Sequence, residues 1–196
     1  MELSQFAAIE GLQMSRLAFV AGLLAIVTQL PGCTASPVRF NAMIPPSFTG
    51  VAQHSGTVSI SVEGSRKELQ WYATGLVSEE ISQALDTAIH ASRVFEDVRR
   101  REESDFHLNV ILRRPGIPVH IDTTVILESE WSLVDRNGKA IWRDTIQGES
   151  TARFSKYPRG TDRMQRASEG AVRATIWNGL ANLSDALRNN HDSDER

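Results

Sequence analysis

A single cysteine, Cys33, stands in this chain of 196 residues. No internal disulfide can form, so the folded part must be stabilised by its core alone. The residues after position 32 are numerous enough for one domain with such a core. The net charge is only −3, and this near balance argues against nucleic-acid binding through bulk positive charge.

The sequence also lacks the common motifs of enzymes. It has no Gly-x-Ser-x-Gly turn, no His-Glu-x-x-His pair and no Gly-x-x-x-x-Gly-Lys phosphate loop. A hydrolase needs a nucleophile that is held by a base, and no such pair is evident. We therefore predict a non-enzymatic protein with no catalytic residue and no cofactor.

A metal site is the next class to consider. His120 and Asp122 are two residues apart and would share a strand face, and His107 would be a third ligand. Nothing in the sequence brings His107 close to the other two. We predict no metal, and interpret these side chains as polar residues at the start of a strand.

Long apolar runs are also missing. The apolar run from Leu17 to Val27 has 11 residues, whereas a helix needs about 20 to span a bilayer. A run of this length is typical of a secretory signal. Residues 1–13 carry no Lys or Arg, but a start at Met14 places Arg16 just before the run. We therefore predict Met14 as the true start.

Leu30-Pro31-Gly32-Cys33 closes this segment. These residues resemble the lipobox of bacterial lipoproteins, which is Leu, a small residue, Gly or Ala, and then Cys. The resemblance implies cleavage between Gly32 and Cys33 and attachment of lipid, including palmitate, to Cys33. Pro31 departs from the usual Ala, Ser or Thr. The alternatives are a secretory signal followed by a free cysteine, or an apolar core helix.

The residue after the cysteine bears on localisation. In enterobacterial-type sorting an Asp there retains a lipoprotein at the inner membrane, and this chain has Thr34. The resemblance therefore implies an outer-membrane protein, anchored by lipid and facing the periplasm. We predict a signal peptide over 1–32 and a lipidated cysteine with an extended tether over 33–56. The alternative is that apolar residues of the tether dock on the domain as an irregular strap: Phe40, Met43, Ile44 and Phe48.

The folded part is predicted over 57–188, followed by a disordered tail over 189–196. Apolar alternation indicates strands, and an apolar stripe at helical spacing indicates helices. The predicted order is a strand at 57–62, a helix at 75–93, strands at 106–112, 124–135 and 139–153, and a helix at 160–187. Small residues in the last helix favour close packing against its neighbour: Ala167, Gly170, Ala171 and Ala174.

Asn137-Gly138 predicts a two-residue hairpin turn, because both positions tolerate positive φ. That turn sets a register in which Leu133 lies opposite Trp142, Trp131 opposite Asp144 and Ser129 opposite Ile146. The register places the apolar residues on one face of the hairpin: Leu127, Trp131, Leu133, Trp142 and Ile146.

The order strand-helix-strand-strand-strand-helix predicts a two-layer α+β domain, with a mixed or antiparallel sheet and both helices on one face. Together with the lipobox, this order resembles several groups of envelope lipoproteins. They are the YajG-type lipoproteins, the penicillin-binding-protein activator lipoproteins, the auxiliary lipoproteins of ABC-type transport and the curli-secretion lipoprotein. The matching stretches are Ser59 to Gly64, the helix before Phe95, the hairpin from Asp135 to Lys139 and the closing helix.

The resemblance implies a non-catalytic interaction or assembly module of the cell envelope with a protein partner. The alternative is an accessory lipoprotein of an ABC-type lipid transport system that binds lipid in a groove. Candidate contact residues are an aromatic pair and two basic clusters: Trp71, Tyr72, Arg99, Arg100, Arg113 and Arg114. The simpler interpretations are core burial for the aromatic pair and solvated turns, balanced by Glu102 and Glu103, for the arginines.

Overall fold

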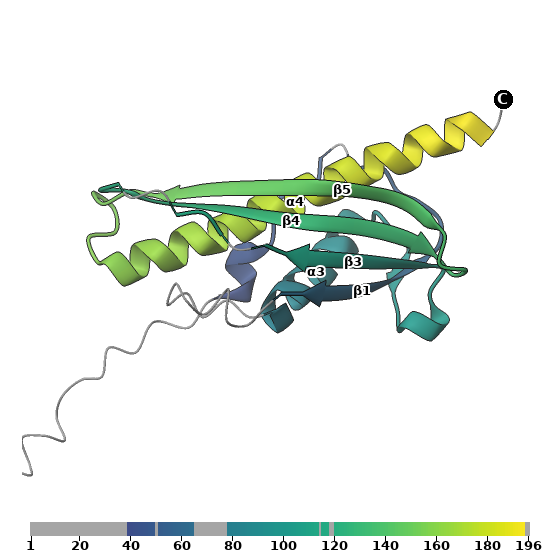
Figure 1. Cartoon of the computed structure of the whole chain (residues 1–196), viewed down its shortest axis with the longest axis horizontal. Helices are drawn as coiled ribbons and strands as arrows, with labels where there is room; N and C mark the ends of the chain where they lie inside the picture. The colour runs from purple at the N-terminus through teal and green to yellow at the C-terminus, as the bar shows by residue number, and fades with distance from the viewer. Residues whose placement is uncertain (1–38, 50, 65–77, 114, 118–119, 195–196) are drawn as a thin grey trace, which may run out of the picture. The chain divides into compact units, whose positions relative to one another are not determined.

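The computed structural model describes residues 39–49, 51–64, 78–113, 115–117 and 120–194 (Figure 1). All of them lie within one compact unit, residues 35–196. The helices and strands are, in chain order, η1 (Phe40–Met43), β1 (Thr57–Glu63), α3 (Ser78–Ser92), β2 (Asp97–Val98), η2 (Arg101–Glu103), β3 (Phe106–Leu112), β4 (Thr123–Asp135), β5 (Ala140–Ala152) and α4 (Gly160–Asp194).

The strands form one mixed sheet in the order β2-β1-β3-β4-β5. β1 pairs in parallel with β2 and β3, whereas β3 with β4 and β4 with β5 are antiparallel. α3 and α4 lie on the same side of the sheet (Figure 1). The α+β prediction is therefore confirmed. Strand β2 was not predicted, because its two residues are too short to show alternation.

The core lies between the sheet and the two helices. Residues that pair directly across neighbouring strands point to the same face of the sheet. On the face that the two helices cover, these residues are mostly buried. The sheet contributes Val58, Leu108, Val110, Trp131, Leu133 and Ile146, and the helices contribute Leu85, Ile89, Ile176, Leu180 and Leu183. The predicted apolar face of the hairpin is part of this core. Its opposite face carries polar cross-strand pairs such as Glu130 with Thr145.

The hairpin register is confirmed, but the turn differs from the prediction. Leu133 pairs with Trp142 and Ser129 with Ile146, as expected. Of the two residues Asn137 and Gly138, only Gly138 has a positive φ, 82°, and its N–H donates to the Asp135 carbonyl at 2.9 Å. The loop is therefore three residues long, and a bulge between Leu133 and Val134 corrects the register.

The segment before β1 packs on the domain from Arg39 onward. We call residues 39–49 and 51–56 the strap. Met43 is fully buried, and the Phe48 ring lies 5.9 Å from the Trp177 ring, between centroids. The Ala52 N–H donates to Ser184 Oγ at 2.7 Å. The structure thus shows the strap alternative, and the extended tether predicted over 33–56 is wrong for these residues.

Helix α4 is longer than predicted. It continues to Asp194, where the sequence suggested a disordered tail. No Gly or Pro follows Gly179 in this stretch, so no residue there interrupts the helix. In the part of the chain that the structure describes, no helix is both long and apolar enough to cross a membrane.

Candidate functional site

Several predicted site residues lie outside the described residues. They are the lipobox pair Gly32 and Cys33, the aromatic pair Trp71 and Tyr72, and Arg114. Their predicted roles in processing, lipidation and binding therefore stay predictions.

The described arginines of the two basic clusters lie apart. Arg99 follows β2, beside the start of β1, whereas Arg113 follows the far end of β3. Each has an acidic neighbour. Arg99 Nε donates to Asp97 Oδ2 at 3.2 Å, and the Arg113 guanidinium pairs with Glu130. Arg100 is exposed in the turn before η2. The three side chains therefore do not form one continuous basic patch.

The residues considered for a metal are also separated. His107 lies on β3 opposite Val134, near the hairpin end of β4. His120 and Asp122 precede β4 at its other end. Asp122 Oδ1 accepts the Phe154 N–H at 2.8 Å, and Ser59 Oγ lies 2.8 Å from His107 Nδ1. Burial, and then the positive charge of Arg101, lower the pKa of His107.

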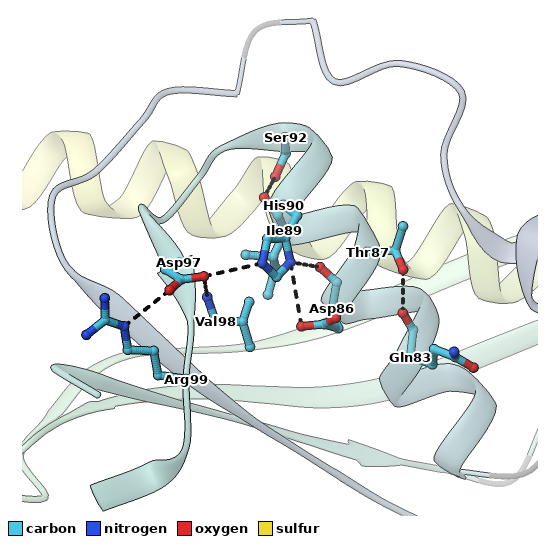
Figure 2. A network of polar contacts seen from close by, with 9 residues as sticks. All are labelled: Gln83, Asp86, Thr87, Ile89, His90, Ser92, Asp97, Val98 and Arg99. Atoms are coloured by element: carbon cyan, nitrogen blue, oxygen red, sulfur yellow. Dashed lines mark hydrogen bonds and ion pairs between the residues drawn. The ribbon is translucent and has the colours of Figure 1, made fainter. Parts of the chain in front are cut away.

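A polar network surrounds His90 at the end of α3 (Figure 2). Its Nδ1 donates to the Asp86 carbonyl at 2.9 Å and lies 3.6 Å from the Asp86 carboxylate. Its Nε2 lies 3.4 Å from Asp97 Oδ1. The hydrogen bond to the Asp86 carbonyl, followed by the two carboxylates, raises the pKa of His90.

Asp97 joins this network to the edge of the sheet. Its side chain accepts from Arg99 Nε and from the Val98 N–H, which lies 2.9 Å from Oδ1 (Figure 2). The hydrogen bond from Arg99 is the main reason why the pKa of Asp97 is lowered. The network therefore favours an imidazolium between two carboxylates.

His90 also lines a surface hollow of about 470 Å³ between α3 and the strap. Six of the seven residues that line it have polar side chains, and the seventh is Phe95: Gln53, His54, Ser55, His90, Arg93, Phe95 and Glu96. Both ring nitrogens of His90 face acceptors, so neither is placed to take a proton from Ser55. Phe95 is only 2% exposed. Within this hollow, His90 is therefore already engaged by Asp86 and Asp97.

A second hollow, of about 360 Å³, was missed by sequence reasoning. Its cations come from the end of β5, the following loop and α4, so they form no cluster in the sequence. Arg166 and Arg173 are seven residues apart and thus share a helix face, which is the signal that was available. We call this site the basic hollow and define it by Arg153, Lys156, Tyr157, Arg166, Glu169 and Arg173.

Known proteins resemble the chain in fold. No family model matches it, and no curated protein matches its sequence. Protein XCC0632 from Xanthomonas campestris, of family DUF330, is similar with a TM-score of 0.60 and 11% identity, over 76% of this chain and 95% of that one. A predicted lipoprotein from Caulobacter crescentus has a TM-score of 0.49 and 14% identity, over 68% and 91%. A minor lipoprotein from Acinetobacter baumannii has 0.40 and 11%, over 71% and 96%.

Proposed function

We propose that this protein is a lipid-anchored lipoprotein of the bacterial envelope, held by Cys33, whose domain is a non-catalytic binding module for another envelope component. The observation that carries the proposal is the sequence Leu30-Pro31-Gly32-Cys33 directly after an 11-residue apolar run. Two or more acyl chains hold a protein stably at a membrane, whereas one does not. Thr34, in place of Asp, supports the outer membrane and its periplasmic side.

The strap supports an anchoring role for the segment before it. Arg39 is already attached to the domain, since its N–H donates to Glu169 Oε1 at 3.1 Å. Arg39 is six positions after Cys33, and a stretched chain of that length covers only about 20 Å. A lipid on Cys33 would therefore hold this domain close to the bilayer.

A binding role is supported by the basic hollow. The hollow beside His90 is lined mainly by polar residues. The basic hollow contains cations that suit an anionic ligand. A module of this kind would act by recognition, and its partner would be another envelope component.

The anchor is tested in cells with labelled palmitate and the variant Cys33→Ala. We expect this variant to accumulate as an uncleaved precursor without label, because the acceptor thiol is gone. Ser36→Ala, three residues further on, is the matched control and should be processed and labelled normally. Incorporation of label into Cys33→Ala would contradict the proposal.

The binding role is tested by crosslinking in cells, followed by identification of the adducts. Repeated recovery of one envelope protein would support an interaction module. Recovery of lipid adducts alone would contradict that role and favour the accessory of an ABC-type lipid transport system.

A further inference from the structure

The basic hollow has an unbalanced charge. It contains four cations, Arg153, Lys156, Arg166 and Arg173, and one carboxylate, Glu169. Glu169 is only 2% exposed. Its Oε1 accepts from the Arg39 N–H at 3.1 Å and from Gln165 Nε2 at 2.8 Å. Its Oε2 accepts from Arg166 Nη1 at 3.2 Å, so its charge is balanced by Arg166.

The other three cations have no such partner. Within the described part of the chain, no carboxylate lies within ion-pair distance of Arg153, Lys156 or Arg173. Like charges that share a concave surface repel one another and raise the local potential for anions. The hollow is therefore complementary to a ligand that carries more than one negative charge.

Three of the four cations are held in place before any ligand arrives. Arg173 Nη1 donates to the Ala42 carbonyl at 2.9 Å, which ties it to η1. The Tyr157 ring contacts two other cations, with Lys156 Nζ at 5.5 Å and the Arg166 guanidinium at 5.9 Å from its centroid. Such cation–π contacts restrict the side chains, and restriction before binding lowers the entropic cost of binding.

Gly170 of α4 lines the hollow and faces Ser150 of β5. A Cβ on Gly170 would lie 2.1 Å from Ser150 Oγ, so the glycine leaves room for this hydroxyl group. Ser150 also lines the site, so its hydroxyl group is an additional donor. The volume of about 360 Å³ falls within the range of about 300–1,000 Å³ for small-ligand sites.

We propose that the basic hollow binds a phosphate group. Arginine recognises phosphate through two parallel N–H···O bonds, and lysine adds a point charge. A phosphate monoester carries about two negative charges at pH 7, which suits three cations that have no carboxylate partner among the described residues. If Cys33 is lipidated, as proposed above, the hollow borders η1 close to the bilayer, so the phosphate of a lipid headgroup is within reach. A soluble phosphate ester offers the same chemistry.

The test uses the chain from Ala35, which contains the whole folded unit and lacks the lipid anchor. Its binding is therefore independent of whether Cys33 is lipidated. The soluble probe is glycerol 3-phosphate. Its binding is measured by calorimetry and by the changes in the amide chemical shifts of Tyr157 and Gly170. The membrane probe is co-sedimentation with phosphatidylcholine vesicles, with and without phosphatidic acid.

The variant is the double change Arg153→Gln and Lys156→Gln, which are exposed loop positions. The matched control is Arg143→Gln with Arg159→Gln, which removes the same charge outside the hollow. We expect the first pair to weaken binding about tenfold or more, equivalent to about 1.4 kcal/mol. The control pair should change it less than about twofold, since exposed charges away from the site are screened.

Binding of both probes, or of one of them, that is weakened only by the first pair supports the proposal. If the first pair weakens only the binding of phosphatidic acid vesicles, the phosphate belongs to a lipid headgroup. If it weakens only the binding of glycerol 3-phosphate, the ligand is a soluble ester. Equal weakening by both pairs, or no binding of either probe, overturns it.

Discussion

At the residue scale, His90 makes the domain sensitive to pH. Its ring lies between Asp86 and Asp97 (Figure 2), and the hydrogen bond to the Asp86 carbonyl contributes most to its raised pKa. The folded pKa therefore lies above the unperturbed value of 6.5. Protonated His90 stabilises the fold fully below that value, and this contribution is lost as the pH rises through the folded pKa.

This linkage predicts a difference between the parent chain and His90→Gln. The parent should lose more stability than the variant as the pH rises above about 6.5. Urea unfolding between about pH 5 and 8 measures it. His107 has the opposite effect, because its pKa is lowered and its protonation opposes folding as the pH falls. Both proteins contain His107, so its contribution cancels when their stabilities are compared. Parallel pH profiles for the parent and His90→Gln would contradict the assignment.

At the element scale, the distance between α4 and the sheet depends on glycines. A Cβ on Gly148 of β5 would lie 2.2 Å from Thr175 Oγ1 and 2.4 Å from the Ala171 carbonyl oxygen. A Cβ on Gly179 would lie 2.5 Å from the Trp131 ring. Gly148 is therefore the small counterpart, on the sheet, of Ala171, one of the small residues predicted for the closing helix.

Gly148→Ala should destabilise the domain by about 1–3 kcal/mol, since the added methyl group meets backbone atoms that cannot rotate away. Gly116→Ala is the matched control, because its nearest atom would lie at 3.8 Å, an ordinary contact. Urea midpoints of the two variants measure the difference. Equal midpoints would mean that α4 can move away from β5 without cost.

The elements also show how far sequence reasoning reaches. Strong periodicity predicted the core strands and both helices, because one buried face leaves a direct trace in the sequence. The register of Leu133 with Trp142 was predicted correctly from a turn that was wrong. The three-residue loop shifts the pairing by one residue, and the bulge after Leu133 shifts it back. Such compensation leaves no signal in composition.

The candidate sites were predicted less well than the fold. The His90 network joins α3 to β2, and the cations of the basic hollow lie on a strand end, a loop and a helix. Only the folded chain brings these residues together. The basic residues Arg99, Arg100 and Arg113 were visible as runs, yet they lie at opposite ends of the sheet.

At the scale of the whole molecule, the domain is larger than the predicted span of 57–188, because the strap is part of its core. Met43 is fully buried within the main hydrophobic cluster. His54 Nε2 also lies 3.3 Å from the Ser184 carbonyl oxygen. The strap therefore closes the domain at the side of α4.

Met43→Ala should accordingly destabilise the whole domain by about 2–5 kcal/mol, as expected for truncation of a buried side chain. Asn41→Ala, two residues earlier and exposed, should stay within about 0.5 kcal/mol of the parent. Thermal unfolding followed by circular dichroism compares them. A Met43→Ala domain as stable as the parent would mean that the strap is not part of the cooperative unit.

The strap also determines when the chain can finish folding. Its partners on α4 come late, since Arg39 bonds to a residue 130 positions away and Ala52 to one 132 positions away. Contacts with such long separations form slowly, because the loop must close first. The first residues of the domain to leave the ribosome must wait for the last helix. The full set of native contacts can therefore form only after α4 has been synthesised.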